Sequence, residues 1–542
     1  MRTLFIISDL HLGGRPHDLH RDGALLPGYQ FNHAYPALIA FIDWVGRQGD
    51  AAGNIELVID GDIVDFLADD DYPGGAQAWT ADEDLAAAKL DLIATRTRGA
   101  DGRGVFETMR DFLAGGNRLT ILLGNHDIEL ALPAVRRRLF ALLGGERPGL
   151  TFIYDGEAYQ TGRVLVEHGN RYDRWNRIDH DALRQERSMR SRRLPIDEAR
   201  RGERYFVPPA GTHMVIDVIN RLKSRYRFID LLKPETGAVV PLLFALEPSS
   251  GKYLNGVINA YLSMPQYFGG GMLGPGEPLS PGLLNTELAV NPTLEQVLTE
   301  ELGLRDAELF IGPYHAAKPR QPAAAAGNLG IGDDARTHTA EAHAWLGEWQ
   351  AVAADGIAAL ARRSIGAIDE WRWRQLHLAL RRVVRRDRSF DLRHEEDAYL
   401  DAAKAIVRGG EIDVVVNGHT HLPKLVPIGC TERPCWYLNT GTWCDVLRLP
   451  GDIGGEFEEA KPALERFVAA LDANALQPYV KRYLSYVEIR LDGDRVAGTP
   501  RLHAYCGPGR ERAAALTEYP AAPAGPAANT RGCDEKPVGK TV

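Results

Sequence analysis

Five short clusters of polar residues carry the side chains of this sequence that could perform chemistry. Each follows directly on a run of β-branched and large apolar residues. The clusters are Ser8-Asp9-Leu10-His11, Gly61-Asp62-Ile63-Val64-Asp65, Gly124-Asn125-His126-Asp127, Glu167-His168-Gly169-Asn170 and Asn417-Gly418-His419-Thr420-His421. Imidazole, carboxylate and amide groups are ordinary ligands of divalent metals. Metal-assisted chemistry is therefore the first hypothesis for these clusters.

Any one of these clusters would be weak evidence by itself. An Asp-x-His pair after a strand is usually a turn or a helix cap, and Gly-Asp and Gly-Asn dipeptides are common turns. An isolated histidine such as His168 is more often a hydrogen-bonded or surface residue than a ligand. Five clusters at the same end of five strands are different, because the loops beyond the carboxyl ends of strands in an α/β sheet converge on one crevice.

The elements that must position the clusters are short strands alternating with helices. The apolar runs that predict strands are residues 3–7, 55–59, 119–123, 164–166, 412–416 and 436–438. Between the early runs, residues 35–48 and 82–94 have apolar side chains at helical spacing, which predicts an α/β sheet. Because the strands are almost continuously apolar, we expect both faces of the sheet to be buried.

The alternation stops after about residue 175 and resumes near residue 391. We therefore predict a catalytic core in two parts, 1–175 and 391–510, an inserted and partly helical cap at 176–390, and a disordered tail at 511–542. The insertion contains two arginine-rich stretches, 171–204 and 372–393. These are consistent with solvated helices that bury an apolar face, or with a patch for an anionic substrate or a membrane surface.

Composition narrows the classes of function. With 63 Lys and Arg against 73 Asp and Glu, the 542-residue chain carries a formal charge of −10, which disfavours sequence-independent nucleic-acid binding. No apolar run is long enough for a spanning helix, and the first residues leave no room for a signal peptide. The five cysteines predict reduced thiols rather than a disulfide framework or a zinc pair at Cys430 and Cys435. We expect a cytoplasmic protein, with peripheral membrane contact left open.

The five clusters in their order resemble the calcineurin-like metallophosphoesterases, whose blocks are D-x-H, GD-x-x-D, GNH-D/E, a lone His with Gly, and G-H-x-H. The resemblance covers residues 1–175 and 391–510 and does not cover the insertion. It implies a four-layer α/β/β/α sandwich, two facing sheets flanked by helices, that carries the large, partly helical insertion. It also implies two metal ions held at one edge of the sheets.

The ligands that the resemblance implies form two sets joined by a bridging carboxylate: Asp9, His11 and His421 at one metal, Asn125, His168 and His419 at the other, and Asp62 between them. His126 follows a ligand and would act on the substrate, as a general acid or by stabilising charge. Asp127 is a candidate to orient the His126 imidazole. For Asp127 and Asp65, a helix cap or a structural hydrogen bond is an equally good interpretation.

Four imidazoles, two carboxylates and an amide form a borderline ligand set that suits Mn, Fe or Zn better than Ca or Mg, with Mn as our first expectation. Such a pair of divalent ions implies attack of a metal-bridging hydroxide on a phosphate ester or pyrophosphate bond. The expected partner is a small anionic, phosphate-containing substrate, and no specific nucleic acid. The sequence decides neither the natural substrate nor the oligomeric state.

Three alternatives remain open. The UDP-2,3-diacylglucosamine hydrolases, which act on a nucleotide-sugar pyrophosphate, are similar at residues 8–12 and 418–423 and also carry a helical insertion. The chain departs from them at His126, where they tend to have Arg, and in its much longer insertion. From a different class, a non-catalytic scaffold with the same fold is disfavoured by the intact ligand set. DNA exonuclease relatives are disfavoured by the acidic charge balance.

Overall fold

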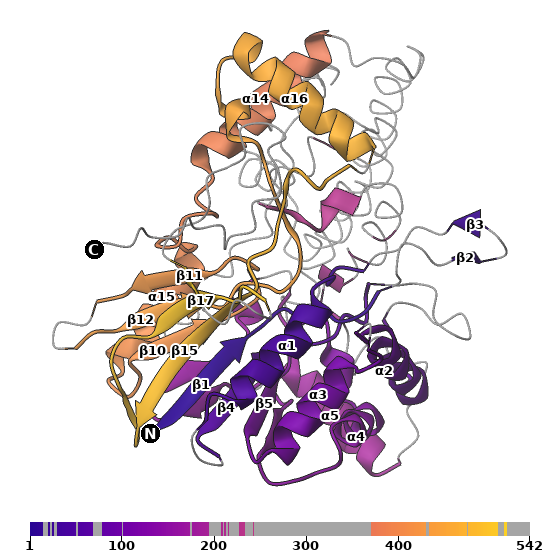
Figure 1. Ribbon diagram of the computed structural model, residues 1–542, viewed down its shortest axis with the longest axis vertical. Coiled ribbons are helices and arrows are strands. Elements are labelled where there is room, and N and C mark those ends of the chain that lie inside the picture. Colours follow the sequence, from indigo (N-terminus) through magenta and orange to yellow (C-terminus); the bar gives the residue numbers. More distant parts are fainter. Residues whose placement is uncertain are drawn as a thin grey trace, which may run out of the picture.

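The computed structural model describes residues 1–14, 20–21, 24–25, 30–49, 53–68, 79–99, 101–173, 176–193, 370–429, 433–473, 475–507 and 514–516, with short stretches between 208 and 242. Most of the predicted insertion and nearly all of the predicted tail lie outside these residues. The described chain is a mixed α/β structure with several sheets (Figure 1). All six predicted strands are present.

The larger sheet has eight strands in the order β18-β17-β15-β1-β4-β5-β6, with β16 paired to β15. Strands β1, β4, β5 and β6 are parallel to one another, and β15 is antiparallel to β1. The bounds are β1 Arg2–Ile7, β4 Ile55–Asp60, β5 Arg118–Leu122, β6 Leu150–Ile153, β15 Ser485–Asp492, β16 Arg495–Val496, β17 Arg501–Ala504 and β18 Ala514–Ala515.

The second sheet has five strands in the order β11-β12-β10-β8-β7. Its three central strands, β12, β10 and β8, are parallel, and the outer two pair antiparallel to them. The bounds are β7 Tyr159–Thr161, β8 Val164–Val166, β10 Val414–Asn417, β11 Lys424–Pro427 and β12 Trp436–Asn439. A separate two-stranded ribbon pairs β2, His20–Arg21, with β3, Ala24–Leu25.

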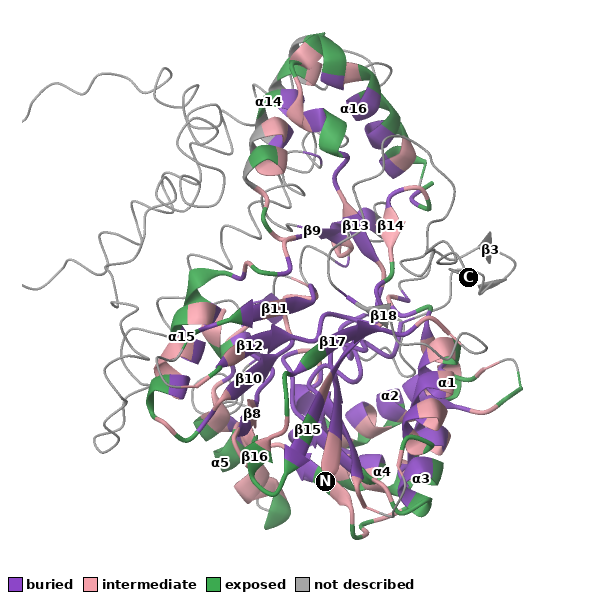
Figure 2. Cartoon of the chain, turned by 60° about the vertical axis from the view of Figure 1, so that its left-hand side comes forward, coloured by how far each residue is buried: buried purple, intermediate pink, exposed green. Residues whose placement is uncertain are grey.

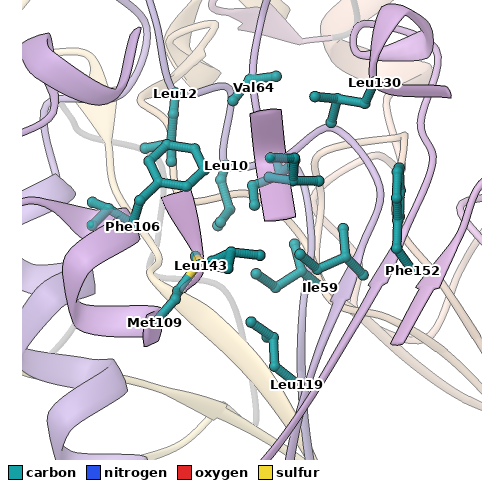
Figure 3. Packing of buried hydrophobic residues seen from close by; sticks show 14 of the residues in the cluster. Leu10, Leu12, Ile59, Val64, Phe106, Met109, Leu119, Leu130, Leu143 and Phe152 are labelled. Atoms are coloured by element: carbon teal, nitrogen blue, oxygen red, sulfur yellow. The ribbon is translucent and has the colours of Figure 1, made fainter. Parts of the chain in front are cut away.

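Alternate side chains of the central strands enter different apolar clusters. Phe5 and Ile7 of β1 pack in a cluster with helices α1 to α4, whereas Leu4 and Ile6 pack against side chains of the five-stranded sheet such as Val416. Figure 3 shows the first cluster, where side chains from strands and helices meet. Both faces of β1 are therefore buried, as its continuous apolar sequence predicts. The helices are α1 Tyr35–Gly46, α2 Glu83–Arg96, α3 Val105–Ala114, α4 Pro133–Leu142 and α5 His180–Ser191.

The helix boundaries follow local sequence signals. Helix α2 begins after Asp82, whose carboxylate accepts hydrogen bonds from the amides of Asp84 and Leu85. Helices α1 and α4 have proline in their first turn, where the missing amide hydrogen costs nothing. Helix α15, Asp397–Arg408, packs Tyr399 and Val407 in a cluster with the five-stranded sheet, on the face away from the larger sheet.

A third group of elements packs beyond the two sheets. It comprises helices α14, Glu370–Arg386, and α16, Phe457–Asp472, with a three-stranded sheet of β9, Leu232–Lys233, β13, Val446–Arg448, and β14, Val480–Lys481. Figure 2 shows the small sheet between the two helices and the rest of the structure. One apolar cluster joins all of these elements. Residues 446–481 therefore pack with α14, although the predicted boundary at 390 assigns them to the core.

The arginines of α14 that are described pair with glutamates of the neighbouring segment. Arg374 lies 2.8 Å from Glu458, and Arg381 pairs with Glu456. These contacts match the interpretation of residues 372–393 as a solvated helix with an apolar inner face, because the arginine charges form ion pairs with glutamates on the surface. They do not support the alternative of a basic patch on that face.

The cysteines differ from the sequence prediction. Cys435 and Cys506 are each disulfide-bonded, and only Cys444 among the described cysteines is a free thiol. The prediction of reduced thiols is therefore wrong for these two residues. The count and spacing of cysteines do not reveal which sulfur atoms the fold brings together, and that proximity decides whether a bond forms. None of the described helices combines the length and the apolar character needed to cross a membrane.

Candidate metal centre

The five polar clusters lie at the carboxyl ends of parallel strands from both sheets. Three of them follow β1, β4 and β5 of the larger sheet, and two follow β8 and β10 of the smaller one. Crossed contacts tie these loops together, since the amide of His11 donates to Asp62 O at 2.9 Å and the amide of His419 donates to Asp9 Oδ2 at 2.9 Å. The structure therefore brings together loops that are up to about 400 residues apart in the sequence.

The backbone is strained at most of the predicted ligands. Five of the seven non-glycine residues with positive φ in the described chain are predicted metal ligands: Asp9 at 50°, His11 at 40°, Asp62 at 50°, His419 at 69° and His421 at 64°. A left-handed conformation costs such residues about 1–3 kcal/mol each and concentrates at functional sites. This strain at five ligands points to a site whose side-chain directions are fixed by the fold.

Two glycines allow the loops to approach one another. A Cβ on Gly124 would lie 2.1 Å from Asp62 Oδ1, and a Cβ on Gly418 would lie 2.6 Å from Asp9 Oδ2. Such contacts are far shorter than van der Waals distances. These positions can therefore hold only glycine without displacing a carboxylate, which explains why Gly precedes Asn125 and His419 in their clusters.

The first predicted ligand set is compact. The Nε2 atoms of His11 and His421 are 3.0 Å apart, and Asp9 Oδ1 lies 3.3 Å from His421 Nε2 and 3.9 Å from His11 Nε2. The ligand atoms of these three residues all lie within 4.8 Å of one another. Asp9 Oδ1 is buried. A buried carboxylate oxygen that faces two imidazole nitrogens is a suitable place for a cation, so the residues present fit a metal.

The second set is centred on Asp62. Its Oδ2 atom lies 3.2 Å from His168 Nε2 and 3.7 Å from His11 Nε2, so this carboxylate stands between the two predicted sets. Asn125 Oδ1 is 3.3 Å from His168 Nε2. Nδ1 of His168 lies 2.7 Å from the carbonyl oxygen of Asp60 and donates to it, which leaves Nε2 as the nitrogen available to a metal. Asp9, Asp62 and His168 again form a group within 4.8 Å.

His419 is placed differently from the other predicted ligands. Its ring centroid is 5.4 Å from that of His168, but its Nε2 lies 3.0 Å from Asp173 Oδ2. Among the described residues, it belongs to none of the compact groups of His, Cys, Asp and Glu side chains. With Nε2 on the carboxylate, only Nδ1 of His419 is left to face a metal.

Asp173 is a functional residue that the sequence analysis missed. Besides His419, it accepts a hydrogen bond from Asn176 Nδ2 at 2.7 Å, and Asn176 Oδ1 accepts one from Asn125 Nδ2 at 3.3 Å. This chain links two predicted ligands of the second metal, as the supporting partners of metal ligands usually do. The only signal in the sequence is a carboxylate five residues beyond His168.

Asp65 contacts two imidazoles. Its Oδ2 lies 3.3 Å from His11 Nδ1, and its Oδ1 lies 3.2 Å from His126 Nδ1. The Asp65 carboxylate thus orients one predicted ligand and the predicted acid at once. Of the two interpretations left open for this residue, the structure favours a supporting role at the site.

Asp127 does not contact the His126 imidazole. Its oxygens accept hydrogen bonds from the amides of Gly124 at 2.7 Å and Ile63 at 2.8 Å. The prediction that it orients His126 is wrong, because the turn after β5 directs its side chain back to the backbone of two loops. Asp127 therefore fixes the position of the Asn125 loop relative to the Asp62 loop.

His126 lies at the open side of the site. Its side chain is 20% exposed, compared with 2% for His11 and 1% for Asp62, with which it forms a third compact group. His421 and His419 are the next most exposed, at 16% and 10%. The exposed rim of the centre thus contains three imidazoles and, beside His419, the Asp173 carboxylate, which is 26% exposed.

The carboxylates remain ionised despite their burial. Burial opposes ionisation of Asp9, but hydrogen bonding with His421 and attraction by His168 lower its pKa to about 2. Burial also opposes ionisation of Asp62, but attraction by His168, His126 and His11 together holds its pKa well below the usual range. Burial and the charge of Lys233 lower the pKa of His421 to about 4. Negative charge at the bottom of the site and a neutral His421 are the states in which these groups bind cations.

In comparisons with known proteins, no family model matches the chain, and no curated protein matches it significantly. The chemistry of the site is therefore argued from its own residues. The described side chains provide two adjacent sets of borderline ligands that share a carboxylate, and an exposed imidazole beside them. Such an arrangement can hold divalent cations and present an anion to His126.

Proposed function

We propose that the protein is a metal-dependent phosphoesterase with a dinuclear centre, which hydrolyses a phosphate ester or a pyrophosphate bond. The observation that carries this proposal is the overlap of the compact ligand groups. Asp9, His11 and His421 form one group, and Asp62 belongs to the other two, one with Asp9 and His168 and one with His11 and His126, which supports two neighbouring positions with Asp62 between them. Two cations that share carboxylate ligands are the arrangement used for in-line displacement at phosphorus.

We further propose that the catalytic core is a four-layer α/β/β/α sandwich. Three apolar clusters support this order. One packs α1 to α4 on the larger sheet, a second joins the two sheets, and a third packs α15 on the outer face of the smaller sheet. The carboxyl ends of strands from both sheets then meet at one edge, where the polar loops interlock.

Each residue has a defined role in this proposal. Asp9, His11 and His421 would hold one ion, and Asn125, His168 and His419 the other, with Asp62 shared; Mn, Fe or Zn suits this set. Bound divalent ions would supply stabilisation of the charge that develops on the phosphoryl oxygens and a lowered pKa for water at the site. His126 contacts the substrate and donates a proton to the leaving oxygen. Asp65 holds the His126 ring in place through Nδ1, which leaves Nε2 toward the substrate.

Metal analysis combined with two activated substrates tests the proposal. We expect purified protein supplied with Mn, Zn or Fe to retain about two ions per chain and to hydrolyse p-nitrophenyl phosphate or bis(p-nitrophenyl) phosphate. In Asp62→Asn the shape is kept and the shared charge is lost, so metal content and turnover fall together. Asp91→Asn is the matched control. Asp91 lies on α2 and pairs with Arg138 of α4 on the surface, so the same substitution is made at a carboxylate that is not a predicted ligand.

The result that would overturn the proposal is a folded protein that binds no divalent ion and cleaves neither ester. That outcome would instead favour a binding or scaffold protein built on the same loops. An Asp62→Asn protein with full metal content and full turnover would contradict the assignment of the shared ligand. Equal losses in Asp62→Asn and Asp91→Asn would mean that the effect is not local to the site.

A further inference from the structure

The small sheet beside the metal centre has two chemically different faces. Leu232 of β9 pairs with Leu447 of β13, which in turn pairs with Val480 of β14, and all three pack in the apolar cluster that contains α14 and α16. Side chains alternate between the faces of a sheet, so the neighbouring residues point the other way. One such neighbour in each strand is basic, and these residues are Lys233, Arg448 and Lys481.

The register places these three cations together on the second face. Arg448 is directly paired with Lys233, and Val446, on the same face of β13 as Arg448, is paired with Lys481. Paired residues lie on the same face with their Cβ atoms about 5 Å apart. Three positive charges are thus held within one patch, and burial together with the charge of Arg448 lowers the pKa of Lys481.

The basic face is turned toward the metal centre. Val446 packs in one apolar cluster with Leu422, the residue after the ligand His421, and with Phe390. The Arg448 guanidinium lies 4.5 Å from the centroid of the Phe390 ring. Lys233, on the same face, is buried, with 6% exposure.

The segment that leads into β13 also contacts the centre. Thr442 Oγ1 and the amide of Trp443 donate to the carbonyl oxygen of Asp9 at 2.7 Å and 3.3 Å. The strand that carries Arg448 therefore begins directly at the loop of one predicted ligand. Its position relative to the metal centre is fixed by hydrogen bonds as well as by apolar packing.

We propose that Lys233, Arg448 and Lys481 form a subsite for a second phosphoryl group of the substrate, next to the one at the metals. The substrate class is then a pyrophosphate-containing molecule rather than a phosphomonoester of a neutral alcohol. This inference rests on the proposed phosphoesterase function. A guanidinium and two ammonium groups are the side chains that bind phosphoryl oxygens best.

Binding of inorganic anions to the full-length protein tests the subsite without relying on turnover. Equilibrium dialysis compares pyrophosphate with orthophosphate, on metal-loaded protein and on protein stripped with a chelator. We expect Arg448→Gln and Lys481→Gln each to weaken pyrophosphate binding by about 10-fold, the loss that accompanies one charge-assisted hydrogen bond. Orthophosphate binding to the metal-loaded protein should change by less than about 2-fold, because the metals hold that group.

Arg374→Gln is the matched control, since Arg374 is paired with Glu458 on α16 and its loss should leave pyrophosphate binding unchanged. Lys233→Gln is also measured, although the burial of Lys233 makes misfolding a risk. Lys481 is only half-buried, so the test can be decided on Lys481→Gln even if Lys233→Gln does not fold. The inference is overturned if Arg448→Gln and Lys481→Gln bind pyrophosphate as the wild type does. It is also overturned if they lose pyrophosphate and orthophosphate affinity equally.

The design separates this inference from the proposed function. If the protein takes up no divalent ion, the proposed function fails, whereas the subsite is still measured by pyrophosphate binding to stripped protein. If the metals bind and bis(p-nitrophenyl) phosphate is cleaved but the variants have no effect, only the subsite fails. Hydrolysis of UDP-glucose compared with farnesyl pyrophosphate then distinguishes a nucleotide source of the pyrophosphate group from a lipid source.

Discussion

Replacing Asp65 with Asn tests how the site controls its imidazoles. Asp65 Oδ1 accepts from the amide of Leu67 at 2.9 Å and lies 3.2 Å from His126 Nδ1, while Oδ2 lies 3.3 Å from His11 Nδ1. The Leu67 amide requires an acceptor, so the Asn oxygen occupies the Oδ1 position and its NH2 group faces His11. A donor there favours the tautomer of His11 that carries its proton on Nε2, the nitrogen that faces the metal site.

The magnitude follows from these contacts. Loss of a partner that fixes a metal-binding histidine typically weakens metal affinity by 10- to 100-fold, or about 1.4–2.7 kcal/mol. The contact to His126 keeps an oxygen and loses only its charge. Because its distance of 3.2 Å is at the long end for a hydrogen bond, we expect kcat at saturating metal to fall by only about 10-fold.

Chelator competition measures the metal affinity of Asp65→Asn, and steady-state kinetics at saturating metal measure its kcat. Asp173→Asn is the comparison, because Asp173 contacts His419 and should weaken the other ion without a direct effect on His126. The reasoning is refuted if Asp65→Asn binds both ions as tightly as the wild type. Asp65 would then act through His126 alone, or only as a structural acceptor for Leu67.

Three further predictions follow from single contacts. His126→Ala should lower kcat by about 10²- to 10⁴-fold with both ions retained, and metal analysis that shows loss of an ion would make His126 a ligand. In Gly124→Ala, the added Cβ would lie 2.1 Å from Asp62 Oδ1, so metal content should fall although no ligand is replaced. Burial and Arg171 lower the pKa of His180 from 6.5 to about 4. The native state therefore loses stability as the pH falls from 6.5 toward 4, by about 1 kcal/mol per pH unit. In His180→Phe, denaturant titrations should lack this dependence; an unchanged slope would contradict the assignment.

The strands and the polar clusters could be predicted from the sequence because their signals are local. The run before Asp9 forms β1, and the run before His419 ends in β10, as continuous apolar segments bounded by Gly and polar residues predict. The helices α1 and α2 were predicted from apolar spacing, and Asp82 supplies the cap at which α2 begins. The ligand types also followed from the sequence, because the residue type alone fixes which donor atoms a side chain can offer.

The supporting contacts of the site could not be predicted in this way. Asp127 is next to His126 in the sequence, but Asp65, from another loop, reaches the His126 ring. Asp173 reaches His419 across about 250 residues, and nothing in either segment signals the contact. Direction decides such contacts, and the direction of a side chain depends on the φ angles of the turns, which the packing of several loops fixes together.

The sequence by itself determined which residues are candidates for metal binding, where six of the strands lie to within about two residues, and that strands such as β1 are buried on both faces. The tertiary structure decided which carboxylate supports which imidazole, that Cys435 and Cys506 are disulfide-bonded, and that Lys233, Arg448 and Lys481 share one face of a small sheet. The physical reason is the distance along the chain over which each kind of signal acts. Apolar periodicity and turn chemistry act over a few residues, whereas the centre is assembled from loops whose proximity depends on the register and packing of both sheets.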